Sequence, residues 1–301
     1  MTTVEVFAPA KINLTLHVVG QRSDGYHVLD SLVAFAGVGD RLTLRTPGTG
    51  RIEVVGPEAD NLVVGSGENL IAKQSAALRD CPDIDCVLEK NLPVSSGIGG
   101  GSADAAAFYR GAMHLATPTV RARMELPQTL AAQVAVGADV PMCIKSRPLR
   151  VGGTGEELEP IQGIPSLPIL LVNPRVPVST PAVFFGLEDK QNLPMNALPD
   201  LQNDPSRLVP WLLRQRNDLQ RPAITQAPVI AGVLEAINAQ PGCMVARMSG
   251  SGATCFGLFN TDRNVEGAAL ALQRKSPDWW IKATWLNGHM LAMPQVIRAT
   301  T

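Results

Sequence analysis

The stretch Leu92-Pro-Val-Ser-Ser-Gly-Ile-Gly-Gly-Gly-Ser-Ala-Asp-Ala-Ala-Ala107 joins a loop rich in glycine and serine directly to a run of good helix formers. Its glycines at positions 97, 99, 100 and 101 allow positive φ angles and close approach of the backbone to a ligand. The helix expected from Ser102 to about Leu115 leaves unpaired N–H groups facing back into the loop, where phosphate is the natural ligand. A flexible linker is the plain alternative, but linkers are rarely followed at once by Ala-Asp-Ala-Ala-Ala.

The loop does not match the commoner nucleotide-binding patterns. No Gly-Lys followed by Ser or Thr comes after it, which excludes a P-loop. The spacing Gly97-x-Gly99-x-x-Ser102 lacks the third glycine of a dinucleotide-binding fingerprint. Neither His-Arg-Asp nor Asp-Phe-Gly occurs in the chain, which excludes the protein-kinase motifs. The sequence therefore predicts a phosphate-binding loop of another kind.

Composition narrows the class of protein. The 301 residues favour two domains, and the formal net charge of −1 gives no reason to expect a nucleic-acid or membrane partner, so we expect a small-molecule substrate. The first ten residues hold no Lys or Arg, and no apolar run reaches the length of a transmembrane helix, which predicts a cytoplasmic protein. The five cysteines and four histidines show neither C-x-x-C nor H-E-x-x-H spacing, so we expect no disulfide framework and no structural metal.

Residues 11–18 alternate strictly between polar and apolar side chains, which predicts a strand with one buried face. Lys11 and Asn13 then point the same way, about 7 Å apart at most. An ammonium group beside an amide can hold a polar ligand. From this pattern alone, an ordinary solvent-facing strand surface is the favoured alternative.

The segment Val136-Gly-Ala-Asp-Val-Pro141 places a single carboxylate, Asp139, among apolar residues beside a turn glycine. A buried and unpaired carboxylate is costly or takes up a proton, whereas a nearby ammonium group keeps it ionised. Lys11 is the candidate partner. An aspartate that merely caps the turn after Gly137 explains the hexapeptide equally well.

The remaining patterns predict the other elements. Strands are expected at 32–38, 41–45 and 51–55, broken by Gly-Asp and Pro-Gly turns, in an antiparallel sheet. A helix at 68–79 and a strand at 85–90 precede the glycine loop, and a helix at 127–136 follows it. Irregular, proline-rich sequence places a boundary near residue 160, giving domains 1–160 and 161–301. In the second domain, a surface loop at 192–205, strands at 167–172, 245–249, 254–259 and 280–285, and helices at 228–238 and 265–272 suit a ferredoxin-like fold.

Three segments together resemble the GHMP kinases, the superfamily of galactokinase, homoserine kinase and mevalonate kinase. Pro93-x-x-x-Gly-x-Gly-Gly-Gly-Ser-Ala is similar to the second motif of that family, Pro9-Ala-Lys-Ile-Asn-Leu14 to its first, and Met248-Ser-Gly-Ser-Gly-Ala-Thr254 to its third. They occur in the family's order and span most of the chain. The resemblance implies an α+β, two-domain GHMP kinase fold, with an N-terminal mixed α/β domain that carries the phosphate loop and a C-terminal ferredoxin-like domain. It also implies ATP and Mg²⁺ as cofactors.

Ser23-Asp-Gly-Tyr-His27 is a turn signal, and by itself it predicts a surface hairpin tip. Together with the first motif, Asp24-Gly-Tyr-His27 resembles one branch of the family, which phosphorylates the 2-hydroxyl of 4-diphosphocytidyl-2-C-methylerythritol in the non-mevalonate isoprenoid pathway. In that branch these positions embrace the cytidine. The chemistry is reasonable, because a planar base favours an aromatic face and a polar partner at its edge.

The resemblance assigns Asp139 as the catalytic base, with Lys11 beside it. It implies ATP-binding positions in the loop and near the adenine, at Pro93, Val94, Ser95, Ser96, Gly97, Ile98, Gly99, Gly100, Gly101, Ser102, Ala103, Asn69 and Lys90. It implies substrate-binding positions at Asn13, Tyr26, His27, Thr180, Phe184, Gly250, Ser251 and Gly252. Ser102 is the candidate Mg²⁺ ligand. Plain alternatives stay open for several of these: a helix-start residue at 69, a solvated lysine at 90, and a buried phenylalanine with an ST-turn in the segment 177–184.

The reaction implied is transfer of the γ-phosphoryl group of ATP to an alcohol. Two other functions compete: a GHMP kinase of homoserine or mevalonate type, which Tyr26 and His27 argue against, and a nucleotide-binding regulator that has lost its chemistry, which Lys11 and Asp139 argue against. The sequence is compatible with a monomer or a homodimer. Asn217-Asp-Leu219 is also shared with the branch, and the sequence defines no role for it.

Overall fold

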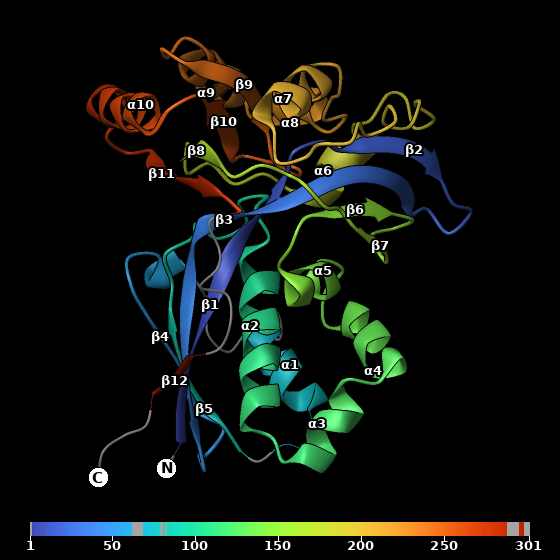
Figure 1. Cartoon of the computed structure of the whole chain (residues 1–301), viewed down its shortest axis with the longest axis vertical. Helices are drawn as coiled ribbons and strands as arrows, with labels where there is room; N and C mark the ends of the chain where they lie inside the picture. The colour runs from blue at the N-terminus through green and yellow to red at the C-terminus, as the bar shows by residue number, and fades with distance from the viewer. Residues whose placement is uncertain (1, 62–68, 79–80, 82, 288–294, 298–301) are drawn as a thin grey trace.

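The computed structural model describes residues 2–61, 69–78, 81, 83–287 and 295–297. Two long antiparallel strands, β1 (Thr2–Asn13) and β3 (His27–Thr46), run along the length of the molecule. Figure 1 shows helices α1 to α5 beside the lower part of these strands and a layer formed by the C-terminal half of the chain above their upper part.

The N-terminal half is a sheet with helices packed on it. β3 pairs with β1 and with β5 (Asp85–Glu89), and β5 pairs in parallel with β4 (Ile52–Val55). The long helix α2 (Gly100–Leu115) packs against β1, and its alanines are buried. Small side chains let the helix lie close to the sheet, which fixes its start in place. Helices α1 (Leu70–Ala77), α3 (Pro118–Met124) and α5 (Val140–Lys145) contact it, and α4 (Pro127–Ala131) and η2 (Ala132–Ala135) connect α3 to α5. The short helix η1 (Ala59–Asn61) follows β4 along the chain.

A second group of strands pairs along the first part of β3 and forms the arm that projects to the right in Figure 1. β2 (His17–Gln21) and β6 (Leu149–Gly152) both pair with β3, and β7 (Glu157–Pro160) pairs with β6. The tip of the β2–β3 hairpin is closed by a hydrogen bond from the Arg22 N–H to the Tyr26 carbonyl.

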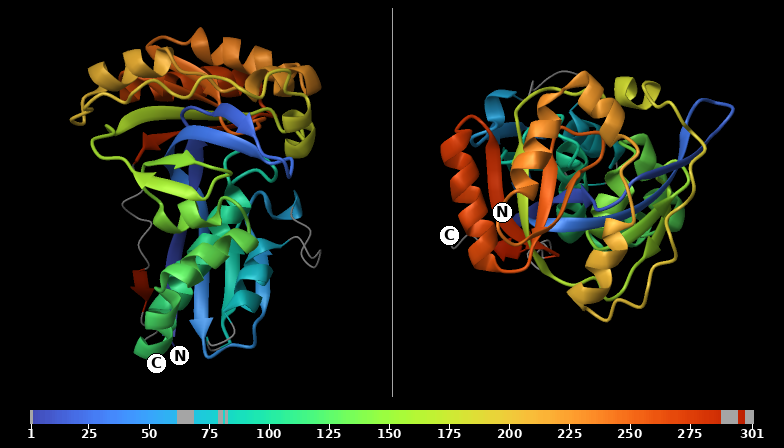
Figure 2. Two further views of the ribbon diagram at one scale, coloured as in Figure 1. Left: turned by 90° about the vertical axis from the view of Figure 1, so that its right-hand side faces the viewer. Right: turned by 90° about the horizontal axis from the view of Figure 1, so that it is seen from above.

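The C-terminal half contains a four-stranded antiparallel sheet in the order β11-β8-β10-β9. Its strands are β8 (Leu167–Asn173), β9 (Cys243–Met248), β10 (Cys255–Phe259) and β11 (Trp280–Leu286). Helix α9 (Val229–Asn238) precedes β9 and α10 (Asp262–Lys275) follows β10, and Figure 2 shows the helices above this sheet. This order is that of a ferredoxin-like fold, which confirms the expected α+β class. The remaining helices are α6 (Thr180–Phe185), α7 (Pro205–Leu213) and α8 (Gln220–Gln226).

The two halves are joined through β3. Leu286 of β11 pairs with Ala36 of β3, and β12 (Gln295–Ile297) returns to pair with residues 3–5 of β1. The N-terminal strands therefore support both halves, and the boundary at residue 160 stays a prediction.

The expected strand at residues 11–18 is wrong in its limits and in its exposure. β1 begins at Thr2 and ends at Asn13, and β2 begins only at His17. Both faces of the segment are buried, because the C-terminal half covers the polar side: Thr15 and His17 are no more than 1% exposed. The alternating polar side chains therefore lie on a face that the rest of the protein covers, and not on a face in contact with solvent.

The expected break at Gly39-Asp40 is also wrong, because β3 continues through it. A Cβ atom at position 39 would lie 2.1 Å from the Ala8 carbonyl oxygen. The glycine therefore allows β3 to approach β1 closely, next to a bulge at Pro9. The parallel β4–β5 pair departs from the antiparallel arrangement expected for the strands of this half. Helices α3 and α5 were not expected, and α2 begins at Gly100 rather than at Ser102. The ends of the helix expected at 68–79 lie outside the described residues.

Within the described ranges, no helix is both long and apolar enough to cross a membrane. The same residues contain no group of three or more His, Cys, Asp or Glu side chains arranged to hold a metal ion.

Candidate active site

The first and third motifs of the sequence meet the glycine loop through the main chain. The Lys11 N–H donates to the Ile98 carbonyl oxygen at 2.9 Å. The Asn13 N–H donates to the Ser249 hydroxyl at 3.0 Å, across the two halves of the molecule. Segments separated by more than 80 residues are therefore held in one place by hydrogen bonds that the backbone of the first motif donates.

Glycines make the crossing of the second and third motifs possible. Gly97, at φ +75°, lies so close to the third motif that a Cβ atom there would be 2.6 Å from the Gly252 carbonyl oxygen. Gly250, at φ +56°, would likewise place a Cβ atom 2.6 Å from the Gly97 oxygen. The Thr254 N–H donates to the Ser96 carbonyl oxygen at 3.2 Å next to this crossing. Neither loop tolerates a side chain at the point of contact.

The glycine loop ends as an N-terminus of α2 that faces the cleft. Gly99 is the N-cap residue, in the left-handed region at φ +66°, and it contributes no side chain to cap the first N–H groups. Those groups remain available to an anion, as at other helix N-termini. Ser95 also lies in the left-handed region, at φ +52°. The loop and the start of α2 thus form a backbone cradle, and phosphate binding there stays a prediction.

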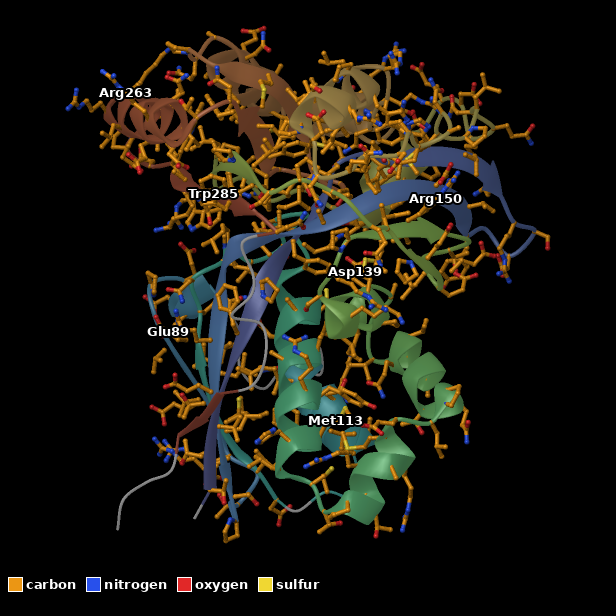
Figure 3. The ribbon with its side chains drawn as sticks, viewed as in Figure 1. Glu89, Met113, Asp139, Arg150, Arg263 and Trp285 are labelled. Carbon is orange, nitrogen blue, oxygen red and sulfur yellow. The ribbon has the colours of Figure 1, made fainter. Side chains whose placement is uncertain are left out.

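Lys11 and Asp139 form the ion pair that the sequence predicted. The Lys11 Nζ lies 2.9 Å from Asp139 Oδ2, and Figure 3 shows Asp139 at the start of α5, where the lower helices meet the upper layer. The Lys11 side chain is 7% exposed and that of Asp139 is 35% exposed. Asp139 occupies the N-cap position of α5 without making a side-chain cap bond. The alternative in which it merely caps a turn is wrong, and its carboxylate faces the cleft instead.

Asn13 extends this pair into a chain of buried polar groups. Its Oδ1 accepts from Lys11 Nζ at 2.9 Å, and its Nδ2 donates to the Ser31 hydroxyl at 2.9 Å. Ser31 donates in turn to the Thr15 carbonyl oxygen at 2.5 Å. The prediction that Lys11 and Asn13 share one face is confirmed, and the ammonium group is held by two neighbours.

These groups line one cleft of about 1220 Å³ between the two halves. It is larger than the roughly 300–1,000 Å³ usual for one small ligand. Most predicted site residues line it, namely Lys11, Asn13, Tyr26, His27, Asn69, Lys90, Pro93, Val94, Ser95, Ser96, Gly97, Gly99, Gly100, Gly101, Ser102, Asp139, Thr180, Phe184, Gly250 and Ser251. Ile98, Ala103 and Gly252 are not among its lining residues. Ile98 and Ala103 are buried in the core beneath the loop, so only their main chain can face a ligand.

One end of the cleft is aromatic. The rings of His27 and Phe184 stack with centroids 4.9 Å apart, and Tyr26 beside them is 66% exposed at the hairpin tip. Burial, followed by the charge of Lys190, lowers the pKa of His27 below its usual value. The Thr180 hydroxyl lies 2.6 Å from that of Ser251, which ties α6 to the third motif. A flat ring and a neutral imidazole at this end suit an aromatic ligand.

Asn69 and Lys90 have structural partners. Asn69 caps α1, with its Oδ1 accepting the N–H groups of Ile71 and Ala72, as the plain alternative expected. Lys90 is not a solvated lysine, because its side chain is 2% exposed and its ammonium group lies between Asp40 and Asp104. Both residues border the cleft, and the ammonium group of Lys90 is bound by the two carboxylates.

Sequence reasoning missed two contributions. Lys190 lines the cleft beside His27, and no carboxylate of the described residues lies within ion-pair distance of it. Lys190 follows an irregular segment, so no sequence pattern indicated that it would line the cleft.

The Asn217 amide donates to the carbonyl oxygens of Met248 and Gly250, at 2.8 and 2.9 Å. These bonds explain the motif Asn217-Asp-Leu219, because they fix the turn that crosses the glycine loop.

Comparison with known families agrees with this geometry. Residues 61–147 match the GHMP kinases N terminal domain, and residues 197–278 match the GHMP kinases C terminal domain. The chain is 51% identical over 289 residues to the 4-diphosphocytidyl-2-C-methyl-D-erythritol kinase of Roseobacter denitrificans, covering 95% of this chain and 94% of that protein. It is 52% identical to the enzyme of the same name from Dinoroseobacter shibae, covering 93% and 94%.

Solved structures give the same result. The chain is similar to a crystal structure of 4-(cytidine 5'-diphospho)-2C-methyl-D-erythritol kinase, with a TM-score of 0.75, 29% identity, and coverage of 94% of this chain and 99% of that one. The homoserine kinase of Cytophaga hutchinsonii shares the fold, with a TM-score of 0.67 and 19% identity over 98% of this chain and 97% of that one. The chain belongs to the GHMP kinases, in the family of the 4-diphosphocytidyl-2-C-methyl-D-erythritol kinases.

Proposed function

We propose that this kinase transfers the γ-phosphoryl group of ATP to the 2-hydroxyl of 4-diphosphocytidyl-2-C-methyl-D-erythritol, in the non-mevalonate isoprenoid pathway. The observation that carries the proposal is the Lys11–Asp139 ion pair at 2.9 Å, in a cleft that also contains the start of α2. The cleft has room for a nucleotide and a second ligand side by side. We expect the enzyme to work in the cytoplasm, as a monomer or a homodimer.

Asp139 acts as the general base in this proposal. Its carboxylate is 35% exposed at the cleft, so a substrate hydroxyl can reach the oxygen that is not bound to Lys11. An alcohol is a far weaker acid than a carboxylic acid, so the proton moves to Asp139 late, as the new P–O bond forms and the bond to ADP breaks. Holding the hydroxyl in line with the phosphoryl group is therefore the larger part of the catalysis.

Lys11 interacts with both the catalytic base and the phosphoryl group that is transferred. Two of its three N–H donors are used, by Asp139 and Asn13, and no other partner occurs among the described residues. The third donor is free to bind an oxygen of the phosphoryl group in transfer. With the N–H groups at the start of α2, it stabilises the negative charge of the transition state.

Mg²⁺ would enter with the ATP phosphates. The described residues offer few oxygen ligands beside the glycine loop: the Ser102 hydroxyl and the Asp139 carboxylate line the cleft there. This set fits Mg²⁺, which usually keeps several waters and binds one or two protein oxygens together with substrate phosphates. When bound, the ion would neutralise part of the phosphate charge.

The aromatic end of the cleft would hold the cytidine. Tyr26 and Phe184 offer ring faces to the base, and His27 offers a polar edge. The single positive charge of Lys190 lies at the same end and suits the diphosphate of the substrate. The sugar alcohol would then extend toward Asn13 and Asp139.

A direct assay tests the proposal. The purified protein is incubated with ATP, Mg²⁺ and the cytidine substrate, and phosphorus NMR should show ADP and a new phosphate monoester. Homoserine and mevalonate serve as control acceptors. Product formed only from a control acceptor would move the chain to another GHMP activity, and nucleotide binding without any product would support a regulator.

A further inference from the structure

Three buried charged side chains lie directly behind the glycine loop and take no part in the reaction described above. The ammonium group of Lys90 lies between the carboxylates of Asp40 and Asp104, and the side chains of the three residues are 2%, 0% and 4% exposed. The Lys90 Nζ is 2.9 Å from Asp104 Oδ2. Buried ion pairs are often no more stabilising than apolar side chains of the same volume, so this cluster needs another explanation.

The cluster fixes the chain just before the loop. Asp40, in the middle of β3, accepts the N–H groups of Asn91 and Leu92 through its Oδ1, at 2.6 and 2.8 Å. These two residues immediately precede Pro93, where the loop begins. Asp40 therefore joins the start of the loop to the central sheet and to Lys90 at the same time.

The cluster also fixes the chain just after the loop. Asp104 belongs to the second turn of α2, and the Lys90 Nζ lies 3.2 Å from the place where a Cβ atom of Gly100 would be, in the first turn. The same ammonium group thus contacts the helix whose first N–H groups face the cleft. Asp104 Oδ1 is buried and has no hydrogen-bond partner among the described residues, so Oδ2 makes the hydrogen bond to Lys90, with the Asp40 carboxylate beside it.

We propose that Lys90, with Asp40 and Asp104, is a positioning residue for the nucleotide: it holds both ends of the loop at residues 93–99 so that its N–H groups point at the phosphates. The proposal rests on the proposed kinase function. The ammonium group of Lys90 is held by two buried carboxylates, so it acts through the loop. A loop that depends on main-chain donors needs this support, because small displacements misalign several hydrogen bonds together.

The cluster needs an acceptor at position 104 more than it needs a second negative charge. Asp40 already neutralises Lys90, and burial, followed by the charge of Asp40, raises the pKa of Asp104 well above its usual value. An amide oxygen at this position can still accept from the Lys90 ammonium group. Asp104→Asn should therefore preserve the loop, and Asp104→Ala should release its helical end.

The test compares these two variants with a control on the same helix. In Asp104→Ala we expect KM for ATP to rise about tenfold, the effect of losing one hydrogen bond to a charged group, with KM for the cytidine substrate within twofold of wild type. Asp104→Asn should restore KM for ATP to within threefold of wild type. Tyr109→Phe, which removes the buried hydrogen bond from α2 to the Met124 carbonyl oxygen, should lower the melting temperature and leave both KM values unchanged.

A KM for ATP within twofold of wild type in a folded Asp104→Ala protein would overturn the proposal. So would a parallel rise of both KM values, because that pattern reports a general loss of structure. If Asp104→Ala does not fold, Asp104→Ser, which is too short to reach Lys90, takes its place. Calorimetric binding of a non-hydrolysable ATP analogue gives the same comparison without turnover, so failure of the kinase function and failure of this inference can be told apart.

Discussion

At the scale of single residues, the position of Asp139 beside Lys11 leads to a prediction about turnover. Asp139→Asn keeps the shape of the side chain but cannot accept the substrate proton, so turnover should fall by roughly 10²–10⁴ while the melting temperature and KM for ATP change little. Glu188→Gln, an exposed carboxylate paired with Arg221, is the control and should be neutral. Steady-state kinetics with the cytidine substrate measures both. Turnover within twofold of wild type would remove Asp139 from the role of base.

The position of Lys190 leads to a second prediction at this scale, about the affinity for the cytidine substrate. Its charge lies at the aromatic end of the cleft without a carboxylate partner among the described residues. Lys190→Ala should raise KM for the cytidine substrate roughly tenfold and leave KM for ATP unchanged, since a charged hydrogen bond to the diphosphate is lost.

Lys190→Arg should keep most of the affinity, because the positive charge stays at the aromatic end. Lys275→Ala, at the end of α10, removes the same charge away from the cleft and should be neutral. Equal effects of Lys190→Ala on both KM values would contradict the assignment.

At the scale of elements, the crossing of the glycine loop with the third motif can be tested by a single methyl group. Gly97→Ala would strain a backbone at φ +75° and place its Cβ atom 2.6 Å from the Gly252 carbonyl oxygen. We expect a loss of about 2 kcal/mol or more in the free energy of unfolding, together with weaker ATP binding. Urea unfolding and calorimetry measure the two effects.

The control is Gly267→Ala, in the exposed middle of α10, where an added Cβ atom meets nothing within 4 Å. That change should stabilise the protein by roughly 0.5–1 kcal/mol, because alanine is the better helix former. A Gly97→Ala protein as stable as wild type would mean that the two loops can separate without cost.

Elements were predictable from the sequence where the pattern is local. The glycine loop, the helix after it and the four strands of the C-terminal sheet follow from runs of residues, and they are confirmed. The strand limits in the N-terminal half were not predictable. The glycine at position 39 suits a turn equally well, and only the contact with Ala8 on β1 decides that β3 continues through it. Helix α5 is hidden because Pro141 looks like a break, although proline is well placed in a first helical turn.

At the scale of the whole molecule, the site depends on contacts between distant segments. The Lys11–Asp139 pair could be predicted, because a lone carboxylate in apolar sequence needs a cation and the motifs named one. The Lys90 cluster and the support that Asn217 gives to the third motif could not, because neither Asp40 nor Asn217 stands in a pattern that names its partner. Buried polar contacts of this kind are fixed only by the assembled fold.

One such contact predicts how stability depends on pH. His17, on β2, joins the N-terminal strands to the C-terminal half: its Nδ1 lies 3.2 Å from the Leu193 carbonyl oxygen, and its Nε2 accepts the Arg216 N–H at 3.2 Å. Burial, followed by the charge of Arg216, lowers the pKa of His17 below 6.5, although the hydrogen bond with Leu193 and the charges of Asp218 and Asp30 act in the opposite direction. The folded protein therefore keeps the imidazole neutral at a pH where the unfolded chain already binds a proton.

Because the unfolded chain binds this proton more readily than the folded protein, stability should fall in acid. The contribution of His17 to stability is complete above about pH 6.5 and is lost as the pH falls below that value toward the lowered pKa of the folded state, because the unfolded chain is stabilised by a proton that the folded imidazole does not bind. His17→Gln, which does not titrate, should be less stable than wild type at pH 8, and the difference should shrink at pH 5. Urea unfolding at the two pH values measures it. A difference that stays constant, or grows in acid, would mean that folding does not lower the pKa of this imidazole.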